Sequence, residues 1–74
     1  MTTTGEYRVG ISFNPSKIPE VDKIKQAAAD LIDMVEDLDD DGDGEKKRLK
    51  ALAMTHVEDA AMWAVKAATK PKKE

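Results

Sequence analysis

The strongest constraint on this fold is a regular repeat of apolar residues between positions 21 and 38. Six apolar side chains follow at intervals of three and four residues: Val21, Ile24, Ala28, Leu31, Val35 and Leu38. This spacing places them along one side of an α-helix, in the arrangement of a heptad seam. Pro19 suits the first turn of such a helix, because its missing N–H costs nothing there. We therefore predict a helix over residues 18–39.

A second helix is predicted over residues 45–69, before Pro71. Its main seam has the same spacing, with three larger side chains beside it: Leu49, Ala53, Val57, Ala60, Ala64 and Ala67, flanked by Leu52, His56 and Trp63. The segment Asp39–Gly44 joins the two helices, and so short a connection makes them antiparallel neighbours. The expected fold class is all-α: a helical hairpin domain over residues 17–69 and a flexible tail over residues 70–74.

Residues 1–16 show no helical period. The stretch from Tyr7 to Phe13 alternates loosely between apolar and polar residues, which suits a short strand or an extended arm. Asn14, Pro15 and Ser16 then favour a turn, because proline fixes its own φ and the polar side chains accept hydrogen bonds from nearby amides. We predict an extended N-terminal arm that ends in this turn.

The size of the chain points to self-association. It has 74 residues, 4% aromatic residues and no cysteine, so it has neither many large core side chains nor disulfides. A fold of this size is close to zero net stability unless something else supports it. Most residues between Ala51 and Ala68 are apolar and point in nearly every direction, so one partner helix cannot cover them. We expect a compact homo-oligomer.

Composition argues against several classes of function. A net charge of −3 disfavours a binder of DNA or RNA polymers, which needs a basic excess. The chain has no apolar run long enough for a membrane span and no apolar signal segment, which fits the cytoplasm. His56 is the single histidine, and no nucleophile with a neighbouring base is visible. We expect no enzymatic activity, no metal site and no cofactor.

The acidic connection also fits a calcium loop in part. Asp37, Asp39, Asp41 and Gly42 match the start of an EF-hand loop, but Arg48 occupies the position of its last carboxylate ligand. A solvated turn is the better interpretation, with a calcium-responsive module as a remote alternative. Acids at the end of the first helix and bases at the start of the second are expected to pair across the hairpin. The alternative is that Arg48 or Lys50 binds an anionic ligand.

Lys25 is the most informative charged residue. It lies on the flank of the apolar seam, where its ammonium can hold a phosphate at the margin of a packed surface. Tyr7 and Phe13 lie in the non-helical segment nearby along the chain. An aromatic ring that stacks on a base, with a cation for the phosphate, makes a minimal nucleotide pocket. The alternative is that both rings only pack the arm onto the helices.

Four segments together resemble a known family. They are Phe13–Ser16, Val21–Lys25, Leu31–Asp33 and Leu52–Ala67. They are similar to the small helical-hairpin domain shared by phage anti-CBASS cyclic-nucleotide sponges and some Thoeris anti-defence sponges. The resemblance covers residues 11–69, and the stretch from Thr55 to Ala64 is its most specific part.

The resemblance implies a function that does not involve catalysis. Such proteins form compact oligomers, typically hexamers, that sequester cyclic oligonucleotides such as cyclic GMP-AMP between protomers. In the cytoplasm of the infected bacterial host, the immune effector then stays inactive. Carried onto this chain, the resemblance assigns the following residues: Tyr7 or Phe13 to a base, Lys25 to a phosphate, Asn14 and Ser16 to polar contacts, and Arg48 and Thr55 to a second class of site. The alternative function is a structural or protein-binding helical oligomer without a small-molecule ligand.

Overall fold

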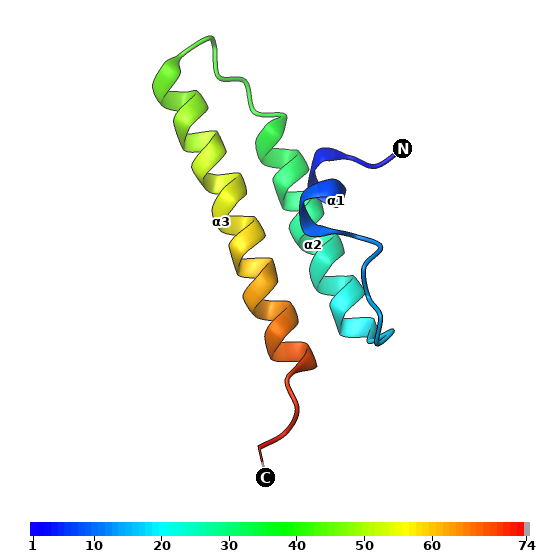
Figure 1. Cartoon of the computed structure of the whole chain (residues 1–74). Helices are drawn as coiled ribbons and strands as arrows, with labels where there is room; N and C mark the ends of the chain where they lie inside the picture. The colour runs from blue at the N-terminus through cyan, green and yellow to red at the C-terminus, as the bar shows by residue number, and fades with distance from the viewer. Residues whose placement is uncertain (74) are drawn as a thin grey trace.

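A computed structural model describes residues 1–73 as three helices, and no strand occurs in that range. They are α1 (Thr4–Val9), α2 (Pro19–Glu36) and α3 (Gly44–Thr69). Helices α2 and α3 run antiparallel as a hairpin, and α1 lies against α2 near the middle of its length (Figure 1). The all-helical hairpin predicted from the sequence is confirmed. None of the helices within residues 1–73 is both long enough and apolar enough to cross a membrane.

The prediction of an extended N-terminal arm is wrong, because residues 4–9 form α1. A capping box starts this helix: the Thr3 hydroxyl accepts from the Glu6 amide at 3.1 Å, and the Glu6 carboxylate accepts from the Thr3 amide at 2.9 Å. Gly10 ends it in the left-handed region at φ 66°. Six residues are too few to show a helical period, so only these end signals mark the helix in the sequence.

Helix α2 begins after a turn that Asn14 holds together. Its amide group donates to the Ile18 carbonyl at 2.8 Å and to an Asp22 carboxylate oxygen at 3.0 Å. The Ile18 amide donates back to the Asn14 side-chain oxygen at 3.2 Å. The predicted turn is thus present, and Pro19 occupies the first helical turn as expected. The helix ends at Glu36, a few residues earlier than predicted.

The hairpin connection is stabilised by its own carboxylates. Asp39 and Asp40 each accept from a backbone amide two residues further on, both at 2.8 Å, and Asp43 caps α3 by accepting from the Lys46 amide at 2.9 Å. Lys50 donates to the carbonyl of Glu36 at 2.9 Å, at the end of α2. The solvated turn that the sequence favoured therefore has a specific hydrogen-bonded form.

The expected pairing of charges across the hairpin is not what the structure shows. The ion pairs among residues 1–73 are Arg8–Glu58, Lys46–Asp41 and Arg48–Glu45. Two of them are local to the connection and the start of α3, and none joins a carboxylate of α2 to a base of α3. Lys50 crosses to α2, but it meets backbone carbonyls, where a cation favours the negative end of the helix dipole.

The core is small and lies beside the predicted seam. Its buried apolar residues are Val21, Ala29, Ile32 and Ala61. Only Val21 among them belongs to the predicted seam of α2, and Leu31 and Leu38 of that seam are 45% and 56% exposed. The buried residues of α2 differ from the predicted seam because α1 covers the neighbouring face of this helix. The seam itself faces an open groove between α2 and α3.

Candidate functional site

The two aromatic residues predicted to bind a base border the same cavity. Tyr7 in α1 and Phe13 in the following turn line an open cavity of about 270 Å³, together with Glu6, Gly10 and Ser12. Both rings are largely exposed, at 81% for Tyr7 and 71% for Phe13. Two exposed aromatic residues at one cavity provide faces on which a nucleobase can stack.

Lys25 lies directly behind this turn, but its ammonium is buried. The residue is 6% exposed, and its Nζ donates to the Gly10 carbonyl at 2.9 Å and to the Phe13 carbonyl. The same Nζ lies 5.3 Å from the centroid of the Phe13 ring, which is within the range of a cation–π contact. The lysine therefore lies against Phe13, one of the two aromatic candidates, and its ammonium is buried instead of lying at the open margin that the sequence predicted.

Asn14 and Ser16 border a second cavity on the other side of the turn. This cavity, of about 240 Å³, is also lined by Phe13, Val65 and Thr69. The Asn14 amide is already engaged in holding the start of α2, whereas Ser16 is exposed at the cavity. Phe13 borders both cavities, so four of the predicted residues gather around one turn: Phe13, Asn14, Ser16 and Lys25.

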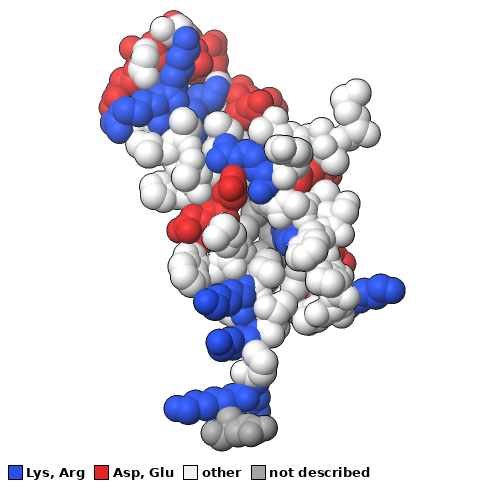
Figure 2. All heavy atoms as spheres, viewed as in Figure 1, with Lys and Arg blue, Asp and Glu red and all other residues white. Residues whose placement is uncertain are grey.

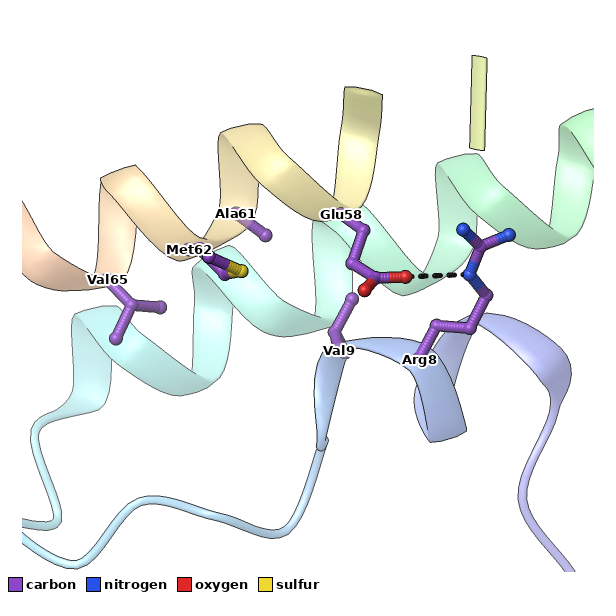
Figure 3. Close-up of a pocket in the computed structure, with 6 residues that line it drawn as sticks. All are labelled: Arg8, Val9, Glu58, Ala61, Met62 and Val65. Atoms are coloured by element: carbon purple, nitrogen blue, oxygen red, sulfur yellow. Dashed lines mark hydrogen bonds and ion pairs between the residues drawn. The ribbon is translucent and has the colours of Figure 1, made fainter. Parts of the chain in front are cut away.

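Thr55 contacts α1 through Arg8. The Arg8 Nε donates to a Glu58 carboxylate oxygen at 2.7 Å, and its Nη2 donates to the Thr55 hydroxyl at 3.4 Å. Figure 3 shows this ion pair beside a cavity of about 200 Å³, whose apolar walls include Met62 and Val65. The clasp of Arg8 with Glu58 and Thr55 therefore ties α1 to α3.

Sequence reasoning assigned no role to Arg8 or Glu58. The available signal was the spacing of Thr55 and Glu58, which puts both side chains on the same face of a helix. Without α1, however, that face had no identified partner. Arg8 itself lay in a segment expected to be extended, so a contact with the second helix of the hairpin was not predicted.

Arg48 is not brought near the aromatic residues. It lies in the first turns of α3 beside the hairpin connection, and it donates twice to Glu45, at 2.8 Å each. This hydrogen-bonded pairing lowers the pKa of Glu45 and raises the pKa of Arg48. Neither cavity bordered by Phe13 includes Arg48, so the structure separates Arg48 from the Lys25 group.

The residues predicted to match a calcium loop make other contacts. Asp39 bonds to a backbone amide of its own turn, and Asp41 pairs with Lys46 at 2.7 Å. Over residues 1–73, no group of three or more histidine, cysteine, aspartate or glutamate side chains is arranged to hold a metal ion. The acidic connection is a structural turn in this fold.

Comparison with known proteins identifies the family. The model of the family described as "Acb2/Tad1, hairpin domain" matches residues 6–69, which include all of α2 and α3 and most of α1. No curated protein and no solved structure matches the chain. The match covers far more than half of the sequence and includes the turn that groups Phe13 with Lys25. The chain therefore belongs to the Acb2/Tad1 hairpin-domain family, the anti-CBASS and anti-Thoeris sponges.

Proposed function

We propose that this protein is a sponge that sequesters cyclic oligonucleotide second messengers, such as cyclic GMP-AMP, in the cytoplasm of an infected bacterium. The messenger is bound and not converted, so the CBASS effector that it would activate stays inactive. The observation that carries this proposal is the pair of exposed aromatic residues, Tyr7 and Phe13, at one open cavity backed by a buried cation.

The proposed contacts follow the chemistry of the ligand. A cyclic dinucleotide offers two flat bases and two phosphates. Exposed aromatic rings can stack on any of the bases, whatever its identity. Tyr7 or Phe13 stacks on a base, and Ser16 offers a hydroxyl at the adjoining cavity. Direct phosphate binding by Lys25 stays a prediction, as does a second class of site with Arg48 and Thr55. Asn14 contributes by shaping the turn as much as by any contact of its own.

We also propose that several copies assemble, with a hexamer as the expected form. The groove between α2 and α3 has a volume of about 360 Å³ and nearly all its lining atoms are apolar, with Ile24, Leu31 and Val57 among its residues. Trp63 is 60% exposed on α3. Contiguous apolar surface of this kind favours contact with another protein surface.

Sequestration requires tight, stoichiometric binding. The sponge succeeds only if its dissociation constant lies below that of the effector, and each tenfold advantage corresponds to about 1.4 kcal/mol. Turnover is unnecessary, and the residues around Phe13 include no pair of side chains suited to nucleophilic attack with a neighbouring base. The protein is therefore proposed to act without enzymatic activity.

The proposal can be tested by calorimetry with cyclic GMP-AMP, cyclic di-AMP and the linear dinucleotide of the same composition. We expect saturable binding of a cyclic ligand at a fixed ratio per protomer, and a higher melting temperature in its presence. The bound nucleotide should be released intact when the complex is denatured by heat. Conversion of the nucleotide would exclude a sponge in favour of an enzyme.

A matched pair of variants identifies the site. Phe13→Leu and Tyr7→Leu remove the exposed rings one at a time, and both keep an apolar side chain. At least one of them should weaken binding by about 5-fold or more, the lower end of what stacking on one base contributes. If wild type binds none of the cyclic ligands, the apolar groove favours the alternative function, a hairpin that recognises another protein.

A further inference from the structure

The hairpin connection contains the dipeptide Asp–Gly twice, as Asp41–Gly42 and as Asp43–Gly44. Such a dipeptide is chemically reactive, because glycine has no side chain to shield its backbone nitrogen from the carboxyl group of the preceding aspartate. The nitrogen can attack Cγ of that aspartate and close a five-membered succinimide ring. Neither cavity bordered by Phe13 includes these residues, so the proposed function does not use them.

The second dipeptide is held by the start of α3. The Asp43 carboxylate caps this helix by accepting from the Lys46 amide at 2.9 Å, and the Asp43 carbonyl accepts from the Lys47 amide at 3.1 Å. Gly44 is the first residue of α3. Ring closure at Asp43 would therefore remove the helix cap, which stabilises the first turn.

The first dipeptide lies outside the helices. Asp41 and Gly42 have φ angles of 54° and 72°, both in the left-handed region, which an aspartate visits only as a single residue. The Asp41 carboxylate pairs with Lys46 at 2.7 Å, and the side chains are 62% exposed for Asp41 and 52% exposed for Lys46. Ion pairs this exposed contribute little stability, so the Asp41 carboxylate is readily released for reaction.

The Gly42 nitrogen also has a base beside it. An Asp40 carboxylate oxygen accepts from the Gly42 amide at 2.8 Å. The nitrogen must lose this proton when it bonds to carbon, and a carboxylate within hydrogen-bond distance can accept it. Within residues 1–73, no carboxylate accepts from the Gly44 amide in the same way. The two dipeptides therefore differ both in how firmly they are held and in how their nitrogens are activated.

We propose that Asp41–Gly42 is a site of self-modification, where the main chain rearranges through a succinimide to isoaspartate, whereas the fold protects Asp43–Gly44. The Gly42 nitrogen gives its proton to Asp40 and bonds to Cγ of Asp41. One carboxylate oxygen of Asp41 leaves as water, with one proton from Asp40 and one from the solvent. Water then opens the ring: cleavage of the bond from nitrogen to Cγ restores aspartate, and cleavage at the backbone carbonyl leaves the chain linked through Cγ.

The isoaspartate product changes the hairpin connection. Its main chain contains one additional carbon between the two helices, and its carboxylate is attached directly to Cα. The ion pair with Lys46 and the hydrogen bond from Gly42 to Asp40 both form at the original spacing of the chain. We therefore expect α2 and α3 to be joined less tightly after the rearrangement.

The test incubates the wild-type protein at neutral pH below its melting temperature, followed by digestion and mass spectrometry. The succinimide is lighter by one water, and an isoaspartate methyltransferase labels the isoaspartate peptide. We expect Asp41 to react about 5- to 30-fold faster than Asp43, the factor that corresponds to releasing a helix cap. The same incubation in urea is the control, where both dipeptides should react at similar rates. Equal rates in the folded protein, or a faster reaction at Asp43, would overturn the proposal.

Three variants assign the groups in the reaction. Asp41→Glu should abolish the product at this position, because the longer side chain closes a six-membered ring much more slowly, whereas the matched variant Asp43→Glu should keep it. Asp40→Asn retains an oxygen that can accept from the Gly42 amide but is a far weaker base, so the reaction should slow several-fold. An unchanged rate in Asp40→Asn would overturn the role of Asp40 as the proton acceptor. None of these measurements requires a cyclic nucleotide, so they are independent of the proposed function.

Discussion

At the scale of single residues, a glycine allows α1 to lie directly on α2. Gly5 is buried, and a Cβ atom at this position would come within 3.0 Å of the carbonyl group and Cα of Ala29. Ala29 is itself fully buried. The Gly5 amide donates to an Asp33 carboxylate oxygen at 2.7 Å, so the same close approach satisfies a backbone donor at the start of α1. The position of α1 therefore depends on the absence of one methyl group.

We predict that Gly5→Ala lowers the free energy of unfolding by about 1–3 kcal/mol, because the added methyl group must push the two backbones apart. Gly44→Ala is the matched control: nothing lies within 4 Å of its added Cβ, and alanine favours a helical conformation. Urea denaturation measures the free energy of unfolding of both variants. A Gly5→Ala protein as stable as wild type would mean that α1 is not packed against Ala29 as described.

Residue types in the sequence singled out several side chains that lie together in the structure, but not the contacts that they make. Lys25, Phe13 and Asn14 were all singled out, and they do come together around one turn. The burial of Lys25 could not be predicted, because it results from the contact of the turn with α2. That contact involves the carbonyl of Gly10, and backbone carbonyls carry no sequence signal. Asn14 was expected to offer polar contacts, and its amide is used to begin α2.

At the scale of elements, the hairpin was predictable and α1 was not. Helices α2 and α3 are long enough for a repeat of three and four residues to be unmistakable, and the glycine-containing acidic segment fixes the turn between them. The same repeat did not predict which residues of α2 are buried, because the buried face is determined by where α1 packs. Helix α1 in turn was hidden by its length, although Thr3, Glu6 and Gly10 mark both its ends.

We predict that the Arg8–Glu58 clasp contributes measurably to the attachment of α1. In a double-mutant cycle with Arg8→Ala and Glu58→Ala, the coupling energy should be about 0.5–1 kcal/mol, at the upper end for ion pairs that remain partly exposed. Their side chains are 25% and 37% exposed. The control cycle uses Arg48 and Glu45, which form a local pair at 59% and 61% exposure and should couple more weakly.

Urea denaturation provides the free energies for both cycles. A clasp that couples no more strongly than the Arg48–Glu45 pair would show that α1 is attached by its packing on α2 alone. In that case Gly5 and Ala29, and not the contact with α3, would decide where α1 lies. Comparing the two coupling energies therefore separates the contribution of α2 to the attachment of α1 from the contribution of α3.

At the scale of the whole molecule, one copy of the chain has very little interior. Its Cα atoms extend over 51 × 29 × 12 Å, so the molecule is thin and elongated. Stable domains bury the apolar faces of their elements between at least two packed layers. Here Leu31, Leu52, Met62 and Trp63 remain between 41% and 61% exposed. We propose that another copy supplies the apolar surface that covers these side chains.

We predict that Leu31→Glu shifts the protein toward smaller assemblies, because it places a charge in the apolar groove between α2 and α3. Leu31→Met is the matched control and should assemble like wild type, since it keeps an apolar side chain of similar volume. Sedimentation measures the assembly state. The melting temperature of wild type should also rise with protein concentration. A melting temperature independent of concentration, with Leu31→Glu unchanged in mass, would contradict assembly through this groove.

The placement of charge along the hairpin has a consequence for such an assembly. Lys66, Lys70, Lys72 and Lys73 lie where α3 finishes or just beyond it. Acidic and basic side chains are mixed around the hairpin connection (Figure 2), but the seven acids from Glu36 to Glu45 outnumber the four bases from Lys46 to Lys50. Each copy therefore has one end with a net positive charge and one end with a net negative charge. Two copies that pack side by side in the same orientation bring ends of like charge together. Reversing one copy brings the lysines of one end against the aspartates of the other. Neighbours in reversed orientation should consequently be preferred, and added salt should weaken that preference.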